Sequence, residues 1–454
     1  MYVIYIICAL GIVSLLAEIF NFKKALLPII IIGLIAAIVA SAFGENTGLA
    51  FSGMVSFDRF SVVYSTLIVT IAFFWFWMAY SYFHNRLNLT DQSALVLFSI
   101  VGAVILTAFA NMAMLFLGIE ILSIALYALA GSKKNNLFST ESSFKYFLMG
   151  SFATGFLLMG IALVYGATGS FELSAIQSAT TNAAHPLPSF FYVGVLLILV
   201  GISFKVSVVP FHFWAPDVYE GAPTPITAFM STIVKMAAFA ALLRLFTVCF
   251  AAVSFTWLVV FYVMCVLTLI VSSVTAVYQS NVKRILAYSS VGHAGYILIA
   301  IVSGGNVGGL VLYYLAGYAV ASLIAFAVIH QIEESGRTVF LSDFQGLFRK
   351  NPLLAVSMTI ALLSLAGIPP LTGFFGKYLL LTQAIRSGHL ALALVAIFAS
   401  LIGVYYYFKV IIVMYSTAGD DRLITITTAQ KVLLFMLMAL VVVLGVFPDW
   451  FTFL

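Results

Sequence analysis

The chain is divided into apolar runs that are long enough to cross a lipid bilayer as helices. A membrane-spanning helix needs about 20 mostly apolar residues. Fourteen runs of this kind lie near residues 2–20, 25–43, 59–83, 92–109, 111–130, 143–166, 189–209, 224–250, 253–277, 284–302, 306–331, 353–385, 390–415 and 428–450. The sequence therefore predicts an all-α polytopic membrane protein of about fourteen transmembrane helices.

Composition excludes a water-soluble fold. Hydrophobic residues make up 64% of the chain and charged residues 8%, whereas soluble domains carry roughly 25% charged residues. The longest polar connections, residues 168–188 and 333–351, are too short for a separate soluble domain. We therefore expect residues 1–454 to form a single transmembrane domain with the lipid bilayer as its surroundings.

Neither the flanks of the first run nor the cysteines indicate a processing site or a cysteine-based site. No basic region precedes the first run and no small-residue cleavage site follows it, so we expect it to remain as a membrane helix. Cys8, Cys249 and Cys265 lie in apolar runs without CxxC spacing. This pattern indicates core packing and neither a disulfide framework nor a thiolate metal site.

Basic residues divide unequally when the loops are assigned alternately to the two sides of the membrane. Arg59, Arg244 and Arg386 fall on one side. Fourteen fall on the other side, namely Lys23, Lys24, Arg86, Lys133, Lys134, Lys145, Lys283, Arg284, Arg337, Arg349, Lys350, Lys409, Arg422 and Lys431. Because cytoplasmic loops are enriched in lysine and arginine, we expect both termini on the non-cytoplasmic side. The net charge of +5 then reflects membrane orientation and does not indicate a nucleic-acid partner.

Glu120 and the three lysines that were assigned to neither side of the membrane lie inside hydrophobic runs. Lys235 follows Thr224 by eleven residues, which places it roughly 16 Å into its helix, and Glu120 lies midway along the run 111–130. Lys205 and Lys377 are the other two. Each such residue costs about 2.5–3.5 kcal/mol at the helix centre, so these positions are expected to face a protein-lined, hydrated interior.

Two interpretations fit these residues. Glu120 and a lysine of a neighbouring helix would form an ion pair that only stabilises the bundle. However, one carboxylate cannot neutralise three lysines, and burial disfavours the charged form of an amine. The favoured hypothesis is a proton relay through Glu120, Lys205, Lys235 and Lys377, in which Glu120 and Lys205 act as a switch that depends on their separation.

Two of the hydrophobic runs are interrupted next to a lysine. Lys205 lies five residues before Pro210, and Lys377 follows a segment with Pro369 and Pro370. Irregular backbone at membrane depth is tolerated where it is buried in protein or lines a wet cavity. Two interrupted segments fit a pair of inverted repeats, approximately residues 92–250 and 253–415, flanked by helices in 1–83 and 428–450. A kink used only for packing is the alternative.

Weaker candidates come from two histidines and one further lysine. His293 lies within its helix and is either a proton carrier that titrates near neutral pH or a core histidine with satisfied hydrogen bonds. His212, at the first interruption, either gates proton entry or binds a freed carbonyl, which is the favoured interpretation. Lys283, at the start of the tenth run, is a third weak candidate.

No pattern in the sequence indicates a cofactor held by this chain. HExxH, CxxC, GxGxxG and P-loop motifs do not occur, which argues against a metal, redox or nucleotide site. The polar connection 333–351, with Asp343, Arg349 and Lys350, fits either a short interfacial amphipathic helix or a surface loop.

Three stretches resemble a known family, the antiporter-like subunits of respiratory complex I and the related multisubunit cation/proton antiporters. Residues 210–225 read PFHFWAPDVYEGAPTP and are similar to the variant of this motif in the subunit N branch, whose VYEG portion separates it from subunits L and M. Residues 281–296, NVKRILAYSSVGHAGY, and the segment from Gly367 to Lys377 are similar to the same branch. The resemblance covers essentially the whole chain.

The resemblance implies a fourteen-helix protein with two inverted five-helix repeats that pumps protons. Glu120 and Lys205 match the charge pair of the family's fifth and seventh helices, Lys235 matches its central lysine, and Lys377 matches the twelfth-helix lysine of subunit N. For a member of the N branch, no counterpart of the long lateral helix at the end of subunit L is expected.

The resemblance also implies partners. NADH, flavin, iron–sulfur clusters and quinone are expected in partner subunits, with quinone reduction elsewhere in the complex as the energy source. The expected partners of this chain are other membrane-arm subunits of complex I in the bacterial cell inner membrane. Two alternatives are the D-type subunit of a multisubunit Na⁺/H⁺ antiporter and a passive membrane scaffold.

Overall fold

The computed structural model describes residues 1–42, 48–84, 88–182, 186–416 and 423–448. Two of the basic loop residues named above, Arg86 and Arg422, lie outside these ranges. The chain divides into two compact units. The first unit comprises Met1–Val206 and Ile233–Phe261, and the second comprises Ser207–Thr232 and Tyr262–Leu454.

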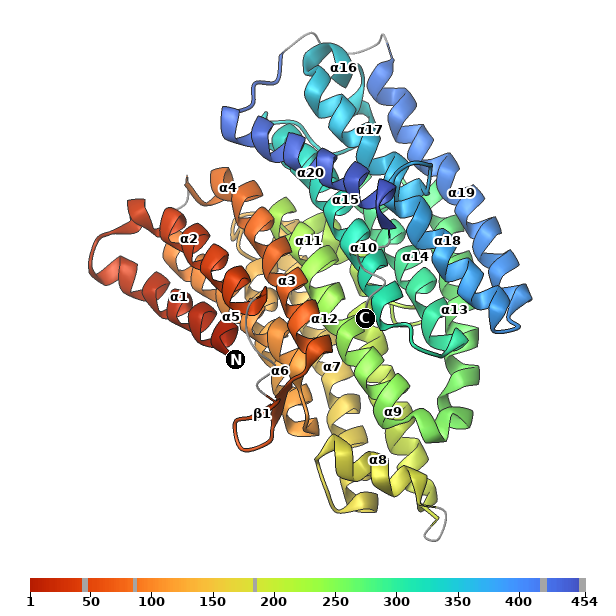
Figure 1. Ribbon diagram of the computed structural model, residues 1–454. Coiled ribbons are helices and arrows are strands. Elements are labelled where there is room, and N and C mark those ends of the chain that lie inside the picture. Colours follow the sequence, from red (N-terminus) through yellow and green to blue (C-terminus); the bar gives the residue numbers. More distant parts are fainter. Residues whose placement is uncertain (43–47, 85–87, 183–185, 417–422, 449–454) are drawn as a thin grey trace. The chain divides into compact units, whose positions relative to one another are not determined.

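The first unit is a helical bundle with one short hairpin (Figure 1). Its elements are α1 (Tyr2–Ile19), α2 (Lys23–Ala42), β1 (Gly48–Ala50), β2 (Val55–Phe57), α3 (Arg59–Met78), α4 (Tyr80–His84), α5 (Leu89–Ala108), α6 (Met112–Ala130), α7 (Leu137–Thr168), α8 (Leu173–Thr181), α9 (Ser189–Val206), α12 (Lys235–Leu243), the π-helix η2 (Arg244–Cys249) and the 3₁₀-helix η3 (Ala251–Val253). Strands β1 and β2 pair antiparallel. Helices α1, α2, α3 and α5 pack against one another, and α6 packs on both α5 and α7.

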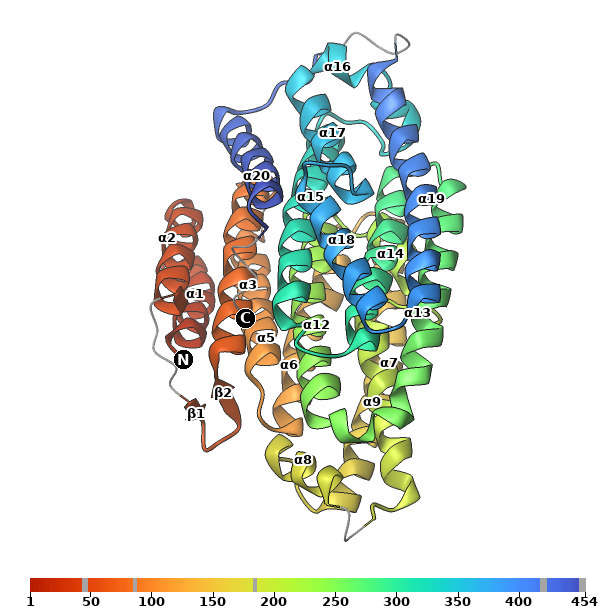
Figure 2. The same cartoon turned by 45° about the vertical axis from the view of Figure 1, so that its right-hand side comes forward.

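The second unit is also helical (Figure 2). Its elements are α10 (Trp214–Gly221), α11 (Thr224–Phe229), α14 (Val282–Ser303), α15 (Gly308–Glu334), the 3₁₀-helix η4 (Leu341–Phe344), α16 (Leu347–Lys350), α17 (Pro352–Ala366), α18 (Thr372–Arg386), α19 (Leu390–Tyr415) and α20 (Thr428–Val446). Two elements cross the boundary between the units, the π-helix η1 (Met230–Val234) and α13 (Ser254–Val277).

The number of spans agrees with the prediction from hydrophobic runs. Thirteen helical segments of the described residues are long and apolar enough to cross a membrane, and they correspond to thirteen of the fourteen predicted runs. The remaining run, 353–385, corresponds to α17 and α18 with a break between them. The predicted fold class, an all-α polytopic membrane protein, is therefore confirmed.

The polar connections contain more regular structure than the hydrophobic runs indicated. Helix α8 occupies part of 168–188, and η4 and α16 occupy part of 333–351. Helix α7 begins at Leu137, six residues before the predicted run, because Asn136 caps it by accepting hydrogen bonds from the backbone N–H groups of Phe138 and Ser139. Capping extends the helix through Ser139, Thr140 and Glu141, which precede the predicted apolar run.

Close helix packing in the first unit depends on glycines in α7 and α9. A Cβ atom on Gly160 of α7 would lie 2.7 Å from the carbonyl oxygen of Gly194 in α9, and one on Gly194 would lie 2.9 Å from the oxygen of Gly160. Small residues let membrane helices approach closely, since lipid supplies no hydrophobic drive for association. This contact fixes α9, and therefore Lys205 near its end, against α7.

The two units share a local backbone motif at the start of α6 and of α14. Asn111 caps α6 and forms a β-bridge with Glu172, while Asn281 caps α14 and forms a β-bridge with Phe340. In each case the bridge joins the residue before one long helix to the segment that follows the next long helix. The same arrangement in both units is what an internal repeat produces.

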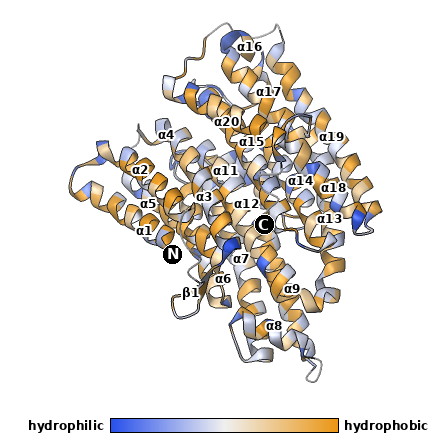
Figure 3. Ribbon diagram, viewed as in Figure 1, coloured by the Kyte–Doolittle hydropathy of each residue, from blue (hydrophilic) through white to orange (hydrophobic). Residues whose placement is uncertain are grey.

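Apolar side chains cover the outside of the long helices. Figure 3 shows hydrophobic residues along the helices, with hydrophilic residues at α16 and near the end of α18. Phe152 of α7, Phe398 of α19 and Ile32 of α2 are among the most exposed large hydrophobic side chains. Apolar surface of this extent is expected to face lipid or other membrane proteins.

Candidate functional site

Glu120 lies near the middle of α6, which packs between α5 and α7. Its carboxylate accepts a hydrogen bond of 2.8 Å from the Thr154 hydroxyl of α7, and the residue is partly buried. The hydroxyl donor satisfies one lone pair of the carboxylate at membrane depth, which lowers the cost of a charge there. Glu120 is thus held by a neutral group.

Lys205 is the penultimate residue of α9 and is 4% exposed. Its ammonium group donates to the hydroxyl oxygens of Ser123 at 2.7 Å and Tyr146 at 3.0 Å. The Nζ atom also lies 5.1 Å from the Tyr146 ring centre and 5.9 Å from that of Tyr127, within the range of a cation–π interaction. Hydroxyls and aromatic rings therefore solvate this cation in place of water.

Glu120 and Lys205 are neighbours through Ser123. Ser123 follows Glu120 by three residues on α6, so the two side chains lie on the same face of the helix. Lys205 donates to Ser123 and not to the carboxylate, although the two charges attract each other electrostatically. The Ser123 hydroxyl therefore contacts the base and lies about one helical turn from the acid.

Lys235 lies at a change in helix geometry. It is the first residue of α12, it directly follows the π-helix η1, and it is 2% exposed. Helix α12 packs against α3, α5 and α9, so Lys235 starts a helix that is surrounded by the first unit. Single π-helical turns frequently occur at functional sites. The periodicity of the sequence carried no sign of this turn.

The chain leaves the helical conformation one residue after Lys205. Helix α9 ends at Val206, and Ser207 has a positive φ of 61°, which is uncommon outside glycine. The N–H group of Val209 donates to the Thr268 hydroxyl at 3.0 Å, which satisfies one backbone group freed by the break. His212 is buried here, and its Nδ1 atom has no hydrogen-bond partner in the described part of the chain.

Helix α10 is anchored to the start of α14 by charged groups. Arg284 donates to carboxylate oxygens of Asp217 and Glu220, both at 2.8 Å. Lys283 is buried and donates to the Ala222 carbonyl at 2.6 Å. These contacts hold the chain that follows the break.

Lys377 of α18 lies beside the second break. Helix α17 ends at Ala366, Gly367 has a φ of 87°, and α18 begins at Thr372. Lys377 is 7% exposed and donates to the Ala366 carbonyl at 2.8 Å and the Ser400 hydroxyl at 3.0 Å. One of its acceptors is therefore a carbonyl from the last turn of α17, which the break leaves without a helical N–H partner.

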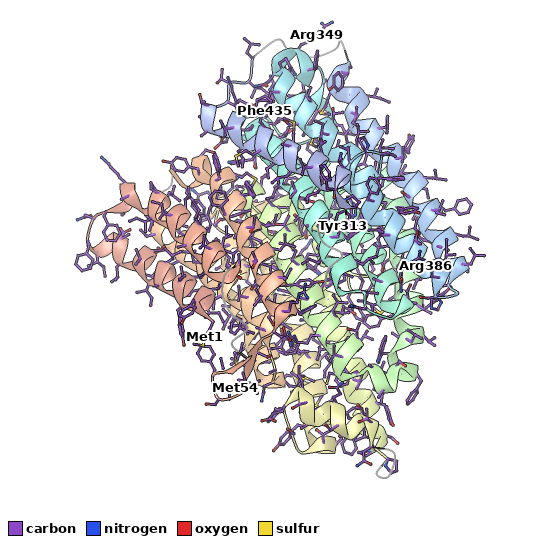
Figure 4. All side chains as sticks on the ribbon, in the orientation of Figure 1. Met1, Met54, Tyr313, Arg349, Arg386 and Phe435 are labelled. Atoms are coloured by element: carbon purple, nitrogen blue, oxygen red, sulfur yellow. The ribbon has the colours of Figure 1, made fainter. Side chains whose placement is uncertain are left out.

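Helices α17 and α18, on either side of the second break, have basic residues near the ends that lie away from the break. Figure 4 places Arg349 in α16, which precedes α17, and Arg386 at the far end of α18. Lys377 lies between these ends, at the depth of the break. Its surroundings therefore belong to the interior of the second unit and not to its surface.

His293 contacts two tyrosine hydroxyls and lines a cavity together with Lys377. Its Nδ1 atom lies 2.6 Å from the Tyr314 hydroxyl and its Nε2 atom 3.3 Å from the Tyr407 hydroxyl, which also bonds Ser289. A cavity of about 10 Å³ is lined by His293, Tyr407, Ser400 and Lys377, among others. A buried water needs about 10–15 Å³, so the cavity is roughly the size of one water molecule.

Hydroxyl groups that contact the ionisable residues of both units were not predicted from the sequence. Ser123, Tyr146 and Thr154 in the first unit, and Ser400 and Tyr407 in the second, contact the predicted charges. A single serine or tyrosine in a membrane helix is common, so only its contact with an ionisable group identifies it. Helical spacing provides one signal, since Ser123 lies one turn from Glu120.

The described residues hold no group of three or more histidine, cysteine, aspartate or glutamate side chains placed to bind a metal ion. Thirteen spanning segments, a broken helix and ionisable groups buried at membrane depth define a polytopic membrane protein of the transport type. The family model described as NADH:quinone oxidoreductase/Mrp antiporter, TM matches residues 109–403. The chain belongs to this family.

Individual relatives agree with this assignment. The chain is 46% identical to the NADH-quinone oxidoreductase subunit N of Cytophaga hutchinsonii, and the match covers 98% of this chain and 97% of that protein. It is similar, with 32% identity and a TM-score of 0.84, to a chain of respiratory complex I from Thermus thermophilus, covering 98% and 97% of the two chains. A chain of the Mrp complex from a Dietzia species shares the fold alone, with 22% identity, a TM-score of 0.83 and coverage of 98% and 93%.

Proposed function

We propose that this chain is the proton-translocating membrane subunit of an NADH-quinone oxidoreductase. The relatives named above support the assignment, since the first is a subunit N and the second belongs to a complex I. The observation that carries it is the placement of Lys205 and Lys377, buried cations bound to hydroxyl or carbonyl groups of neighbouring helices. The chain is then part of an enzyme whose redox centres lie in other subunits.

Each unit contains the parts of a proton relay. In the first unit, Glu120, Ser123 and Lys205 connect an acid to a base, and α12, which carries Lys235, packs against the helix of Lys205. In the second unit, Lys377 and His293 line one cavity with Ser400 and Tyr407. Because a charge at membrane depth costs several kcal/mol, a change in the surroundings of one lysine favours transfer of its proton to the next acceptor.

The energy for transport has to come from partner subunits. Moving one charge against a membrane potential costs about 2.3 kcal/mol per 100 mV. Quinone reduction, with NADH, flavin and iron–sulfur clusters in other chains, supplies this energy under the proposal. Other membrane-arm subunits are the partners, and the exposed apolar helices of this chain provide surfaces for them.

The location of the chain in the plasma membrane follows from the same proposal. The chain lies in a bacterial cell inner membrane with both termini on the non-cytoplasmic side, because basic loop residues are enriched on the opposite side. The repeats near 92–250 and 253–415 have inverted topology. The paired motifs at Asn111 and Asn281 support this repeat, since they occur at the starts of α6 and α14.

The second candidate function is the D-type subunit of a multisubunit Na⁺/H⁺ antiporter, which shares the fold. The VYEG segment favours the oxidoreductase, since it resembles the subunit N variant of this motif. It lies in α10, where Glu220 accepts hydrogen bonds from Asn281 and Arg284. A gene cluster without the quinone-site and NADH-arm subunits would favour the antiporter. A passive scaffold is the third candidate. In that case the buried lysines take no part in proton transfer.

We expect Tyr407→Phe to slow NADH-driven proton pumping by about three- to tenfold in membrane vesicles that contain the assembled complex. The phenylalanine keeps the ring but removes the hydroxyl that bonds His293 and Ser289. Tyr405→Phe is the matched control, because Tyr405 lies on the same helix with its side chain exposed. Equal pumping by the two variants would show that the Tyr407 hydroxyl is not part of the relay.

A further inference from the structure

A second cavity, of about 290 Å³, lies in the first unit and is lined by the β1–β2 hairpin, α8 and η2. Its polar lining residues are Ser56 of the hairpin, Glu172, Ser174 and Gln177 at α8, and Arg244 of η2. Ligand pockets begin at about 300 Å³, so the cavity has room for a small polar group of a ligand.

The cavity lies where membrane spans end. Helix η2 ends the span Thr224–Cys249, and Ala110, which also lines the cavity, lies between the spans Leu89–Ala108 and Met112–Ala130. The hairpin precedes the span Arg59–Met78. Figure 1 shows β1 and α8 at the same end of the helices of this unit. Lipid headgroups lie at this level, because they border the apolar core that the spans cross.

Arg244 carries a charge that the protein already balances. Its guanidinium donates to both carboxylate oxygens of Asp58, at 2.8 and 2.9 Å, and to the Ser61 hydroxyl at 2.8 Å. Burial raises the pKa of Asp58, but the Arg244 charge and the hydrogen bonds from Ser61 outweigh burial and keep this pKa below its ordinary value. Asp58 is therefore ionised at neutral pH, and the ion pair as a whole is neutral.

Arg244 nevertheless retains an unused donor beside the cavity. Its Nε atom is buried and has no hydrogen-bond partner among the described residues. Buried donors are normally satisfied by an acceptor. Arginine N–H groups bind phosphate oxygens strongly, so a phosphate in the cavity is a suitable acceptor for this group.

Helix α8 adds further donors to the same wall. Its first two residues, Leu173 and Ser174, line the cavity. The start of a helix carries partial positive charge and binds phosphate groups. The side chains of Ser174 and Gln177 form no hydrogen bond with other described residues, so both are available to a ligand.

Glu172 supplies a carboxylate on this wall. It is the N-cap residue of α8, but its exposed side chain makes no capping hydrogen bond and no ion pair with the described residues. Because Asp58 neutralises Arg244, Glu172 leaves the group with a net negative charge. A purely anionic ligand is therefore disfavoured, whereas a ligand that places a cation at Glu172 and a phosphate at Arg244 is favoured.

The remaining lining residues distinguish between zwitterionic headgroups. None of the described lining residues is aromatic. Quaternary ammonium groups are typically recognised by aromatic cages, whereas a primary ammonium donates hydrogen bonds to oxygen acceptors. Leu49 and Val248 also line the cavity and are 69% and 51% exposed, so an apolar surface adjoins the polar wall. Such a surface suits the acyl chains of a lipid.

We propose that this cavity binds the headgroup of phosphatidylethanolamine, with the phosphate beside Arg244 and the start of α8 and the primary ammonium at Glu172. The bound headgroup joins the β1–β2 hairpin to α8 and η2. The inference is independent of the proposed function, because it concerns lipid binding and involves none of the proposed relay residues.

The first test measures access to the cavity in the assembled complex. Ser174→Cys and Ser178→Cys each place a thiol at an exposed position of α8, but only Ser174 lines the cavity. The complex is placed in nanodiscs of phosphatidylethanolamine or of phosphatidylcholine, and maleimide labelling of each thiol is followed by peptide mass spectrometry. We expect phosphatidylethanolamine to slow labelling of Ser174→Cys about tenfold relative to phosphatidylcholine, and to leave that of Ser178→Cys unchanged.

The second test removes the acceptor for the ammonium group. In the Ser174→Cys background, Glu172→Gln is expected to restore labelling in phosphatidylethanolamine to within about twofold of the rate in phosphatidylcholine, because the charged acceptor is lost. Glu141→Gln is the matched control and is expected to keep the protection, since Glu141 is an exposed glutamate that pairs with Lys145 and does not line the cavity. Protection that survives Glu172→Gln would overturn ammonium recognition by Glu172.

Three further results would contradict the proposal. Equal labelling of Ser174→Cys in the two zwitterionic lipids would exclude selection of the primary ammonium. Stronger protection by phosphatidylglycerol would indicate a site for anionic lipid. Protection by soluble glycerophosphoethanolamine in phosphatidylcholine nanodiscs would indicate that a free headgroup, and not the lipid, is the ligand.

Discussion

Lys205→Met is expected to lower NADH-driven proton pumping by at least about tenfold, because methionine keeps the length of the side chain but carries no proton. The lysine connects Ser123 of α6 to Tyr146 of α7, so its loss interrupts the route from Glu120. Pumping is measured in inverted membrane vesicles, with assembly of the complex checked on a native gel.

Lys409→Met provides the control for Lys205→Met. Lys409 also donates to oxygen acceptors, the carbonyls of Val277 and Gln279, each at 3.2 Å, but it lies outside the proposed relay. Its replacement is expected to leave pumping near the level of the unchanged complex. Equal losses in the two variants would mean that the replaced lysines are needed for structure alone.

Gly160→Val is expected to destabilise the first unit by about 3 kcal/mol and to lower the amount of assembled complex. The contact of Gly160 with the Gly194 carbonyl leaves no room for a side chain, and the backbone of α9 cannot turn aside as a flexible side chain does. Displacement of α9 also moves Lys205 away from Ser123. Assembly on a native gel and thermal unfolding in mild detergent measure the effect.

Gly155→Val is the matched control in the same helix. A Cβ atom on Gly155 meets no heavy atom within 4 Å, so valine is accommodated without a shift of the backbone. We expect this variant to assemble normally. If Gly160→Val assembled as well as Gly155→Val, the close approach of α7 and α9 would be wrong.

Hydrophobic runs were sufficient to predict the spans, because lipid requires a continuous apolar stretch of nearly fixed length. The prediction extended to the two breaks, since Pro210 and the pair Pro369–Pro370 interrupt such stretches in the sequence itself. Helix α8 was not predicted, because it is short and lies outside the apolar runs.

The partners of the charges depend on tertiary packing. Glu120, Lys205 and Lys377 were recognisable because an ionisable residue is rare in an apolar run. Their hydrogen-bond partners, such as Tyr146 and Ser400, come from other helices and are ordinary residues in their own segments. The π-helix before Lys235 also has no signal in residue type or spacing.

Proton translocation per NADH oxidised is the measurement that bears most directly on whether buried lysines carry the pumped protons. Vesicles with an assembled complex carrying Lys235→Ala are compared with vesicles carrying Lys235→Arg, which keeps the positive charge but cannot release its proton. A relay predicts loss of pumping in both variants. Unchanged pumping in Lys235→Ala, or restored pumping in Lys235→Arg, would contradict the relay and indicate that Lys235 has a structural role.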